Sequence, residues 1–432
     1  MKKPGSIILK EDTKVESAFL VGIQTQQCPE EVCQELLDEL AELVSTLGLA
    51  ILDSCIVKLR DQNPRFLIGE GKAREIIDNA LAVGADVIIF DDSLSPAQQR
   101  NWEELEEDIA VIDRQEVILE IFAAHAHTSE ARLQVALAQA NYSLPRLKRR
   151  WTHLHRQRGM TGGMGMRGEG EQQLEVDSRM VRARIAKLKT QLAEVRKRRG
   201  VQRQQRLRKP VPVAAIVGYT NAGKSSLLNA MTSAGVLTAN KLFATLDPTV
   251  RRYTLPGGLD ILLADTVGFI RKLPHLLVEA FHSTLEETAI ADYIVEVVDA
   301  TSPSLEEHRR TTLEVLDEIG ASTQSIITVL NKIDLVDEPI ARQRLQRLFP
   351  DAIFGSAKTG EGIPELAAQL EAFCDANSLK RHLLIPHDRH DVIAKIRKTC
   401  TIDSEEYDDD GVHLLVRAPK AALNIIEDWG AS

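Results

Sequence analysis

The chain has 432 residues, enough for about three domains, and 44% of its residues are hydrophobic, enough for real cores. It has no apolar run of about 18 residues or more and no signal-peptide core near its start, so we expect a cytoplasmic protein without a membrane partner. Five scattered cysteines without a C-x-x-C pair indicate neither a zinc site nor a disulfide framework. The formal net charge of −10 argues against a nucleic-acid partner unless the charge is unevenly distributed.

Residues 1–128 are predicted to form a small α/β domain. Short apolar stretches alternate there with helical stretches, such as 30–47 and 73–83, and this alternation is typical of a mostly parallel sheet. The strands expected in this sheet are 18–23, 51–57, 86–90 and 109–112.

The run Gly69-Glu70-Gly71-Lys72 lies between an expected strand at 65–68 and the helix that follows. Glycines at the start of a helix could bind an anion, but this run is shorter than a complete phosphate loop. We therefore interpret it as a tight strand-to-helix turn, with anion binding as the alternative.

Residues 129–200 are predicted to form an antiparallel helical hairpin. Apolar residues repeat at intervals of four and three in two successive segments, which predicts two helices packed along their lengths. The first stripe is Leu133, Leu137, Ala140, Leu144, Leu147 and Trp151. The second is Leu174, Val181, Ile185, Leu188, Leu192 and Val195, with Ser178 at the one missing step. Because proline lacks an N–H to donate, Pro145 is expected to kink or divide the first arm.

The hairpin and the linker after it are strongly basic. From Arg146 to Lys209 there are 20 Lys and Arg against 5 Asp and Glu, so this segment carries +15 and the remaining chain −25. Such asymmetry is typical of a polyanion-binding segment, and a solvated basic helix without a partner is the alternative. The tip at 159–170 has six glycines in twelve residues, beside Arg156, Arg158 and Arg167. We expect it to contact structured RNA rather than to be a disordered linker.

A linker at 201–212 leads into a nucleotide domain predicted at 213–376. Its first motif follows an expected strand at 213–217 and precedes a helical stretch. The motif fits G-x-x-x-x-G-K-S and consists of Gly218, Tyr219, Thr220, Asn221, Ala222, Gly223, Lys224 and Ser225. The backbone N–H groups of such a loop bind phosphate, Lys224 adds a positive charge at the β- and γ-phosphates, and Ser225 supplies a hydroxyl to Mg²⁺.

Three further motifs follow expected strands at 259–264, 326–330 and 352–354, and each serves another part of the same ligand. Asp265-Thr266-Val267-Gly268 places an aspartate near a Mg²⁺-bound water and a glycine N–H near the γ-phosphate. Asn331-Lys332-Ile333-Asp334 offers a carboxylate to the ring N–H and amine of guanine, a pair of donors that adenine lacks. Ser356-Ala357-Lys358 offers backbone N–H groups to the guanine carbonyl. Together these motifs predict a Mg²⁺-dependent GTPase.

A segment without helical period lies between the phosphate loop and Asp265, and it contains Phe243, Ala244, Thr245, Leu246 and Asp247. We expect it to order around the triphosphate, with Thr245 as a Mg²⁺ ligand beside Ser225 and with Thr249 as the alternative. Catalytic roles are assigned to Lys224, Thr245 and Gly268. Phe269 stands where Ras-like GTPases hold a glutamine that orients the attacking water, so we expect slow hydrolysis until a partner completes the site.

Residues 377–432 are predicted to form a small α+β domain. We expect a helix at 391–398, a strand at 412–416 and a last helix at 420–427. The run Asp408-Asp409-Asp410-Gly411 is interpreted as a hairpin turn, because the later ligands of a calcium loop are missing.

The order of these parts resembles the HflX-type GTPases, ribosome-associated members of the Obg-HflX-like group in the TRAFAC class. The resemblance covers roughly residues 17–375, and it rests on the nucleotide motifs and on the tip, which reads Gly-Gly-x-Gly-x-Arg-Gly-x-Gly-Glu. It implies a GTPase that binds the large ribosomal subunit near the peptidyl transferase centre and splits stalled or idle ribosomes. It also implies ATP binding by the N-terminal domain in some members, for which Gly69 to Lys72 is a candidate. Glu169 replaces a proline that is usual in the tip of this family and adds a negative charge there.

We therefore expect a monomer that binds guanine nucleotides, Mg²⁺ and the ribosome. The alternative is a GTP-dependent scaffold or regulator that acts on another structured RNA without splitting ribosomes, and ribosome-stimulated turnover would separate a scaffold from an enzyme. A nucleotide kinase also uses a phosphate loop, but it has no need for the guanine motif at 331–334.

Overall fold

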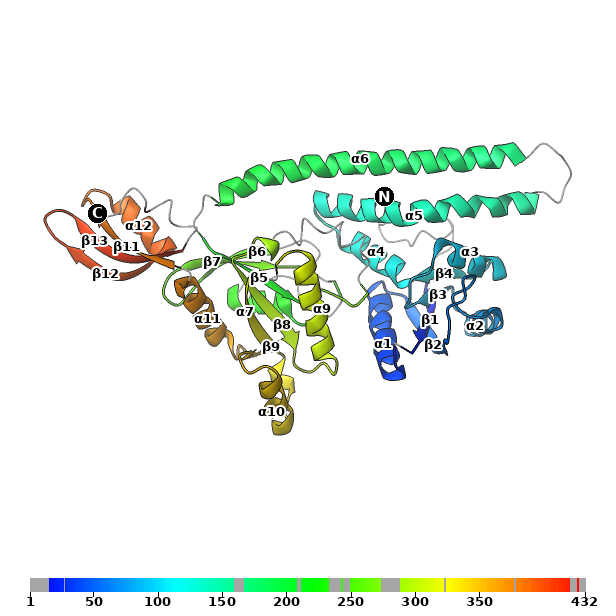
Figure 1. Ribbon diagram of the computed structural model, residues 1–432, viewed down its shortest axis with the longest axis horizontal. Helices are drawn as coiled ribbons and strands as arrows, with labels where there is room; N and C mark the ends of the chain where they lie inside the picture. The colour runs from blue at the N-terminus through cyan, green and yellow to red at the C-terminus, as the bar shows by residue number, and fades with distance from the viewer. Residues whose placement is uncertain are drawn as a thin grey trace. The chain divides into compact units, whose positions relative to one another are not determined.

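The computed structural model describes residues 15–26, 28–158, 167–207, 211–232, 242–243, 249–272, 288–321, 324–376, 378–419 and 426. The chain divides into two compact units within its longest described helix, between Ala193 and Glu194. Figure 1 shows the helices and strands of both units. The limits predicted from the sequence for the individual domains stay predictions.

The N-terminal sheet has the predicted α/β character, and each described strand is parallel to its neighbours. The strands are β1 (Ser17–Gln24), β2 (Ala50–Lys58), β3 (Val87–Phe90) and β4 (Ala110–Asp113), in the order β2-β1-β3-β4. The helices are α1 (Glu30–Thr46), α2 (Glu70–Ala82), α3 (Pro96–Leu105) and α4 (Arg114–His125). The sequence pattern indicated these four strands together with α1 and α2, and it missed α3 and α4.

Residues 65–68 form a turn instead of the expected strand, so this prediction is wrong. Two backbone hydrogen bonds of 2.9 and 2.8 Å between Asn63 and Leu67 close the turn, and Leu67 has a positive φ of 70°. The segment is apolar because Phe66 packs into the hydrophobic core from this loop. Phe66 is 1% exposed. Gly69 is the N-cap of α2, so the glycine run begins a helix after a loop rather than after a strand.

Helix α5 (Ser129–Arg158) packs on α3 and α4 through a face that the sequence pattern did not single out. The residues buried on this face are Ala131, Gln134, Val135, Ala138 and Tyr142. Of the predicted stripe, Ala140 is buried, whereas Leu133, Leu137 and Leu144 are half-buried. The helix continues through Pro145, so the proline does not divide the arm.

A buried polar network holds α5 against the end of β4. The Asp113 carboxylate accepts from the Tyr142 hydroxyl at 2.9 Å and from the Leu94 N–H at 3.0 Å, and it pairs with Arg146 at 3.4 Å. The Arg146 guanidinium also lies over the Tyr142 ring, 3.4 Å from its centroid. Burial, reinforced by the charge of Asp113, raises the pKa of Glu116 in this network to about 7. The network therefore gains negative charge as the pH rises through neutrality.

Glu116→Gln is expected to stabilise the N-terminal unit above neutral pH. A carboxyl whose folded pKa is about 7, above its ordinary 4.5, holds its proton more tightly in the folded chain, so stability falls between about pH 5 and 7. The amide can still accept from the Tyr142 hydroxyl, which lies 3.3 Å from the Glu116 carboxylate. Urea unfolding at pH 8 should show a gain of about 1 to 3 kcal/mol, and at about pH 5 none. Equal shifts at both pH values would contradict the assignment.

Helix α6 (Arg167–Leu207) confirms the predicted second stripe. Within 176–195 the apolar residues of this stripe and Ser178 are buried or half-buried, while most residues between them are exposed. Figure 1 draws α5 and α6 as two long helices with opposite chain directions, as a hairpin requires. Of the glycine-rich tip predicted at 159–170, residues 159–166 lie outside the described residues, and residues 167–170 form the start of α6 instead of a loop.

The nucleotide domain has a sheet in the order β10-β9-β8-β5-β7-β6, in which only β6 is antiparallel to its neighbour among the described strands. The strands are β5 (Val213–Gly218), β6 (Thr249–Thr254), β7 (Asp260–Asp265), β8 (Tyr293–Asp299), β9 (Ser325–Asn331) and β10 (Ile353–Phe354). The helices are α7 (Lys224–Thr232), α9 (Leu305–Glu318), the short η1 (Ile333–Leu335), α10 (Pro339–Leu348) and α11 (Ile363–Ala376).

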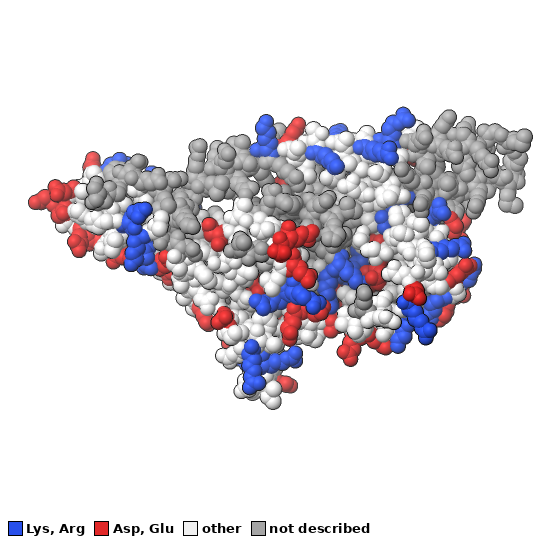
Figure 2. Space-filling model, in the orientation of Figure 1, with Lys and Arg blue, Asp and Glu red and all other residues white. Residues whose placement is uncertain are grey.

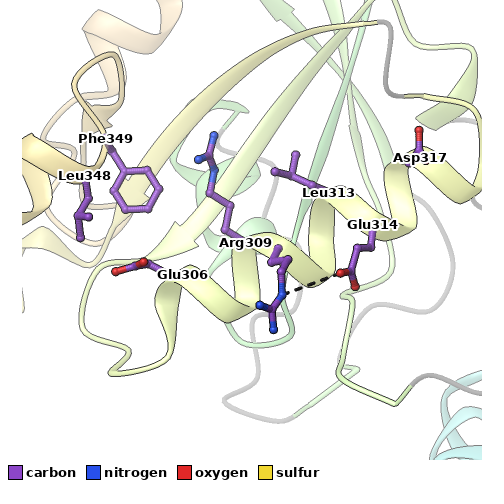
Figure 3. A pocket seen from close by; sticks show the side chains of 8 residues that line it. Glu306, Arg309, Leu313, Glu314, Asp317, Leu348 and Phe349 are labelled. Carbon is purple, nitrogen blue, oxygen red and sulfur yellow. Dashed lines mark ion pairs between the residues drawn. The ribbon is translucent and has the colours of Figure 1, made fainter.

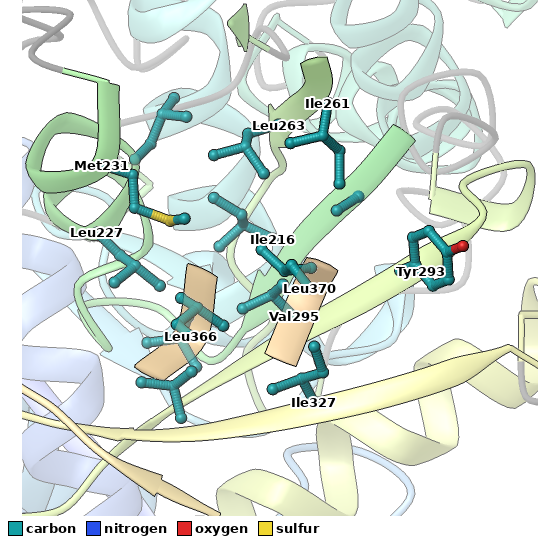
Figure 4. Packing of buried hydrophobic residues seen from close by; sticks show 14 of the residues in the cluster. Ile216, Leu227, Met231, Ile261, Leu263, Tyr293, Val295, Ile327, Leu366 and Leu370 are labelled. Carbon is teal, nitrogen blue, oxygen red and sulfur yellow. The ribbon is translucent and has the colours of Figure 1, made fainter. Parts of the chain in front are cut away.

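Two apolar layers cover the opposite faces of this sheet. On one face, residues of α7 and α11 such as Leu227 and Leu366 pack on Ile216 and Val295 of the central strands (Figure 4). On the other face, Val298 and Leu330 pack against residues of α9 and α10. The carboxyl ends of the central parallel strands lie at one edge of this sheet, and the predicted nucleotide motifs follow these ends.

The C-terminal part is the predicted small α+β fold. Its strands are β11 (Ser378–Ile385), β12 (Thr401–Tyr407) and β13 (Val412–Pro419), antiparallel in the order β11-β13-β12, and its helix is α12 (His390–Thr399). Asp408 accepts from the N–H groups of Asp410 and Gly411 at 2.9 and 3.1 Å, which confirms a hairpin turn between β12 and β13. The helix expected at 420–427 lies outside the described residues, apart from Ile426.

Candidate nucleotide site

The phosphate loop joins β5 to α7 and depends on its two glycines. Gly218 has a φ of +145°, and a Cβ on it would lie 2.2 Å from the Val297 carbonyl oxygen. Gly223 has a φ of +95°, and a Cβ there would lie 2.2 Å from the Asn331 side-chain nitrogen. At both positions the backbone has a positive φ, and a neighbouring atom lies too close for any side chain to fit. Gly218 therefore lets the loop pack closely against β8, and Gly223 lets it pack closely against the end of β9.

The predicted Lys224, Ser225 and Asp265 come together at the start of α7. The Lys224 ammonium donates to the Tyr219 carbonyl at 2.7 Å, and the Ser225 hydroxyl donates to the Asp265 carboxylate at 2.6 Å. Burial lowers the pKa of Lys224 to about 8, against the opposing charge of Asp265. A hydroxyl and a carboxylate at this distance are hard oxygen donors of the kind that Mg²⁺ prefers, so the residues fit the ion.

The segment after β7 is tied to the phosphate loop by backbone contacts. The Thr220 N–H donates to the Phe269 carbonyl at 2.8 Å, and the Phe269 N–H donates to the Gly218 carbonyl at 3.1 Å. Thr266 donates its hydroxyl to the Ile216 carbonyl at 2.8 Å and so fixes the end of β7 on β5. The Phe269 ring is 1% exposed, so this residue offers the site its backbone alone.

Tyr219 links the phosphate loop to two residues that sequence reasoning missed. Its ring stacks on the His308 ring of α9, with centroids 3.7 Å apart and planes at 8°. Its hydroxyl accepts from the Arg271 N–H at 2.8 Å. Neither His308 nor Arg271 belongs to a motif, so no sequence signal could have found them.

Asn331 connects the two halves of the site. Its side-chain amide donates to the Ala222 carbonyl at 2.8 Å and accepts from the Ala357 N–H at 2.9 Å, and the residue is 2% exposed. The phosphate loop and the loop at 356–358 are thus held by one side chain. Asn331 was predicted to contact the nucleotide, and here both ends of its amide are used within the protein.

The other residues of the predicted guanine motif differ in their contacts. Lys332 has a positive φ of 64°, and its ammonium donates to Asp299 at 2.6 Å. Ile333 is buried in the core beneath the motif. Asp334 is half-buried, and its carboxylate has no hydrogen-bond or ion-pair partner among the described residues. It is the member of the motif with acceptor capacity to spare.

The loop at 356–358 already uses its backbone donors. The N–H groups of Ser356, Ala357 and Lys358 donate to the Glu361 carbonyl, the Asn331 side chain and the Ser356 hydroxyl at 2.9, 2.9 and 3.2 Å. A guanine carbonyl would have to share or exchange one of these donors. That the loop contacts guanine stays a prediction.

The segment expected to order around the triphosphate is described only at its edges. Ala244, Thr245, Leu246 and Asp247 lie outside the described residues. Phe243 is buried, with a positive φ of 56°. Thr249, the alternative metal ligand, begins β6 and pairs with Asp265 of β7 in the antiparallel ladder.

A separate hollow of about 510 Å³ lies between α9 and the end of α10, and Figure 3 shows its lining. Arg309 lines it, donates to the buried Glu296 at 3.2 Å and places its guanidinium 5.1 Å from the centroid of the Phe349 ring. None of the predicted site residues lines this hollow, so it is distinct from the nucleotide site.

The fold and the site define the class of this protein as a P-loop GTPase. The features that define it are a mostly parallel sheet, a phosphate loop bounded by two glycines, the Ser225–Asp265 hydrogen bond and the available Asp334 in the base motif. Three family models match the chain in succession, described as GTP-binding GTPase N-terminal at 34–123, GTP-binding GTPase Middle Region at 125–206 and 50S ribosome-binding GTPase at 213–332.

The relatives cover nearly the whole chain. The GTPase HflX of Akkermansia muciniphila is 46% identical, over 96% of this chain and 97% of the relative, and that of Escherichia coli is 42% identical, over 96% and 95%. The chain belongs to the HflX family of GTPases, whose members hydrolyse GTP. A solved GTP-binding protein from Sulfolobus solfataricus in complex with GDP is 25% identical, over 83% of this chain and 98% of that one, with a TM-score of 0.43. Among the described helices, none is both long and apolar enough to span a membrane.

Proposed function

We propose that this GTPase binds the large ribosomal subunit through its basic hairpin, hydrolyses GTP slowly unless the ribosome stimulates it, and dissociates or rescues stalled or idle ribosomes. It would do so as a monomer in the cytoplasm, where ribosomes are found. The matching family description, 50S ribosome-binding GTPase, supports the choice of partner.

The observation that carries the proposal is a set of exposed basic side chains on α6. Arg179, Arg182, Arg184, Lys187 and Lys189 are exposed and form no ion pair with another described residue. Figure 2 shows several blue side chains along the described part of this helix, with few red ones among them. Basic groups without acidic partners on one helix are suited to a phosphate backbone, which is bound by charge and with little regard to sequence.

The chain's own residues have distinct roles in GTP hydrolysis under this proposal. Lys224 neutralises charge on the β- and γ-phosphates, and the backbone N–H of Gly268 faces the γ-phosphate. Ser225 and Thr245 would hold Mg²⁺, with Asp265 accepting from the Ser225 hydroxyl as it does here. When bound, the ion supplies charge neutralisation of the triphosphate. Asp334 recognises the donors of guanine.

The buried Phe269 supports slow hydrolysis by the isolated chain. A ring that is 1% exposed cannot orient an attacking water, and it cannot swing out without leaving a cavity. The ribosome would raise the rate by supplying a group or by fixing the loops. Nucleotide state would then set ribosome affinity, because the two binding events share one free energy of coupling.

Replacement of Arg179, Arg182 and Arg184 by Gln is expected to weaken co-sedimentation with large subunits. Each lost phosphate contact should lower the slope of log affinity against log salt by about 1, so the triple variant should lose about 3. The wild type should co-sediment more with a non-hydrolysable GTP analogue than with GDP.

A matched control replaces Lys72 and Arg74, which are also exposed but pair with Glu75 and Glu70. It should sediment as the wild type does. Unchanged binding and slope in the triple variant would refute the hairpin contact. Binding to free structured RNA but not to subunits would favour the alternative, a regulator that does not split ribosomes.

A further inference from the structure

The hydroxyl groups at the phosphate end of the site differ in one respect. Three of them have defined partners: Tyr219 accepts from Arg271, Ser225 donates to Asp265, and Thr266 donates to the Ile216 carbonyl. The Thr220 hydroxyl has no partner in the described part of the chain, although only 6% of the residue is exposed. Buried hydroxyls are nearly always hydrogen-bonded, so this group calls for a partner that the chain does not supply.

Thr220 lies beside the residues that are expected to bind the γ-phosphate of GTP. A Cβ on Gly268 would lie 2.9 Å from the Lys224 ammonium and 2.9 Å from both Cα and Cγ2 of Thr220. The Cα and methyl group of Thr220 and the Lys224 ammonium therefore all lie beside Gly268, with the Thr220 hydroxyl on the same Cβ as that methyl group. Lys224 and Gly268 are the groups that approach the γ-phosphate in P-loop GTPases. The Thr220 backbone is held in place there by its bond to the Phe269 carbonyl.

We propose that Thr220 is a catalytic residue whose hydroxyl contacts the attacking water and the γ-phosphate. It accepts a hydrogen bond from the water and donates one to a γ-phosphate oxygen, which a hydroxyl can do at once. The water oxygen forms a bond to the γ-phosphorus as the bond to the bridging oxygen of GDP breaks. The water proton passes to the released phosphate, so threonine ends the step unchanged. This role rests on the GTPase activity and replaces, in part, the glutamine that Phe269 displaces.

A packing role is the competing explanation, because the Thr220 methyl group lies close to Gly268. Two substitutions separate the roles. Thr220→Val keeps the shape and methyl contact but removes the hydroxyl, whereas Thr220→Ser keeps the hydroxyl and removes the methyl group. A residue needed for packing tolerates Val better than Ser, and a residue needed for its hydroxyl shows the opposite order.

The experiment measures single-turnover GTP hydrolysis by the full chain without ribosomes, together with the affinities for GTP and GDP. Thr220→Val should hydrolyse GTP at least about 10-fold more slowly, on the scale of removing one group from a transition-state site. Its affinity for both nucleotides should stay within about 2-fold of the wild type, because the contact strengthens in the transition state. Thr220→Ser should hydrolyse at close to the wild-type rate.

A wild-type rate in Thr220→Val, or a larger loss in Thr220→Ser than in Thr220→Val, would overturn the proposal. If Thr220→Val fails to fold, Thr220→Gly removes the hydroxyl together with the methyl group, and a wild-type rate there would overturn the proposal equally. Because no ribosome is present, these results do not depend on whether the hairpin binds one. A failure of ribosome binding leaves the assignment of Thr220 untouched.

Discussion

Substitution of Asp334 by Asn is expected to reverse the base preference from guanosine to xanthosine nucleotides. The Asp334 carboxylate, which has acceptor capacity to spare in this structure, matches two donors on guanine, and bonds to a charged acceptor contribute about 1.5 to 3 kcal/mol each. Asparagine places a donor where the guanine amine also donates, so GTP affinity should fall about 100-fold or more. Xanthine carries a carbonyl at that place and should bind better than guanine. Competition binding with GTP, XTP and ATP measures the change.

Asn331→Ala is the matched control for base recognition. Its side chain bonds to Ala222 and Ala357 within the protein, so its loss should weaken binding of GTP and XTP together. An Asp334→Asn variant with unchanged selectivity would mean that another residue recognises the base.

Gly223→Ala is expected to abolish tight nucleotide binding. The added Cβ would lie 2.2 Å from the Asn331 side-chain nitrogen at a φ of +95°, so Asn331 must leave its two partners. Two buried groups then lose their hydrogen bonds, at a cost of about 1 to 3 kcal/mol each, in addition to backbone strain of about 1 to 2 kcal/mol. Affinity for GDP, measured by calorimetry, should fall more than about 100-fold.

Gly360→Ala separates the contact from the strain. Gly360 also has a positive φ, of +86°, but a Cβ there would meet nothing within 4 Å. This variant should lose only about 1 kcal/mol of stability and keep its nucleotide affinity. If both variants bind GDP equally well, the contact of Gly223 with Asn331 has no role in the site.

The nucleotide motifs were predictable because they combine local chemistry with position. A motif after an apolar strand of a parallel sheet must lie at the carboxyl edge, so Lys224, Asp265 and Asp334 could be assigned to one site without coordinates. The stripe of α6 was predictable because a half-buried helix shows its period. The strand predicted at 65–68 was wrong for a related reason. A buried apolar residue such as Phe66 gives the same sequence signal whether it lies in a strand or in a turn.

Contacts between distant segments could not be read from the sequence. The face that α5 buries includes Gln134 and Tyr142, so it is partly polar and has no apolar periodicity that would predict it. The stack of Tyr219 on His308 joins residues 89 positions apart, counted from their numbers. The hydrogen bonds of Asn331 could not be predicted from its motif. An asparagine that connects two loops and an asparagine that contacts the base are identical in the sequence.

The two hydrogen bonds of the Asn331 side chain have a consequence for the binding of small ligands. One buried amide is hydrogen-bonded to both Ala222 and Ala357. Ordering of either loop should therefore lower the entropy cost of ordering the other. A guanosine fragment and a pyrophosphate fragment added together should therefore bind more tightly than their separate affinities predict. An inhibitor that spans both loops would gain from this cooperativity, and one confined to either end would not.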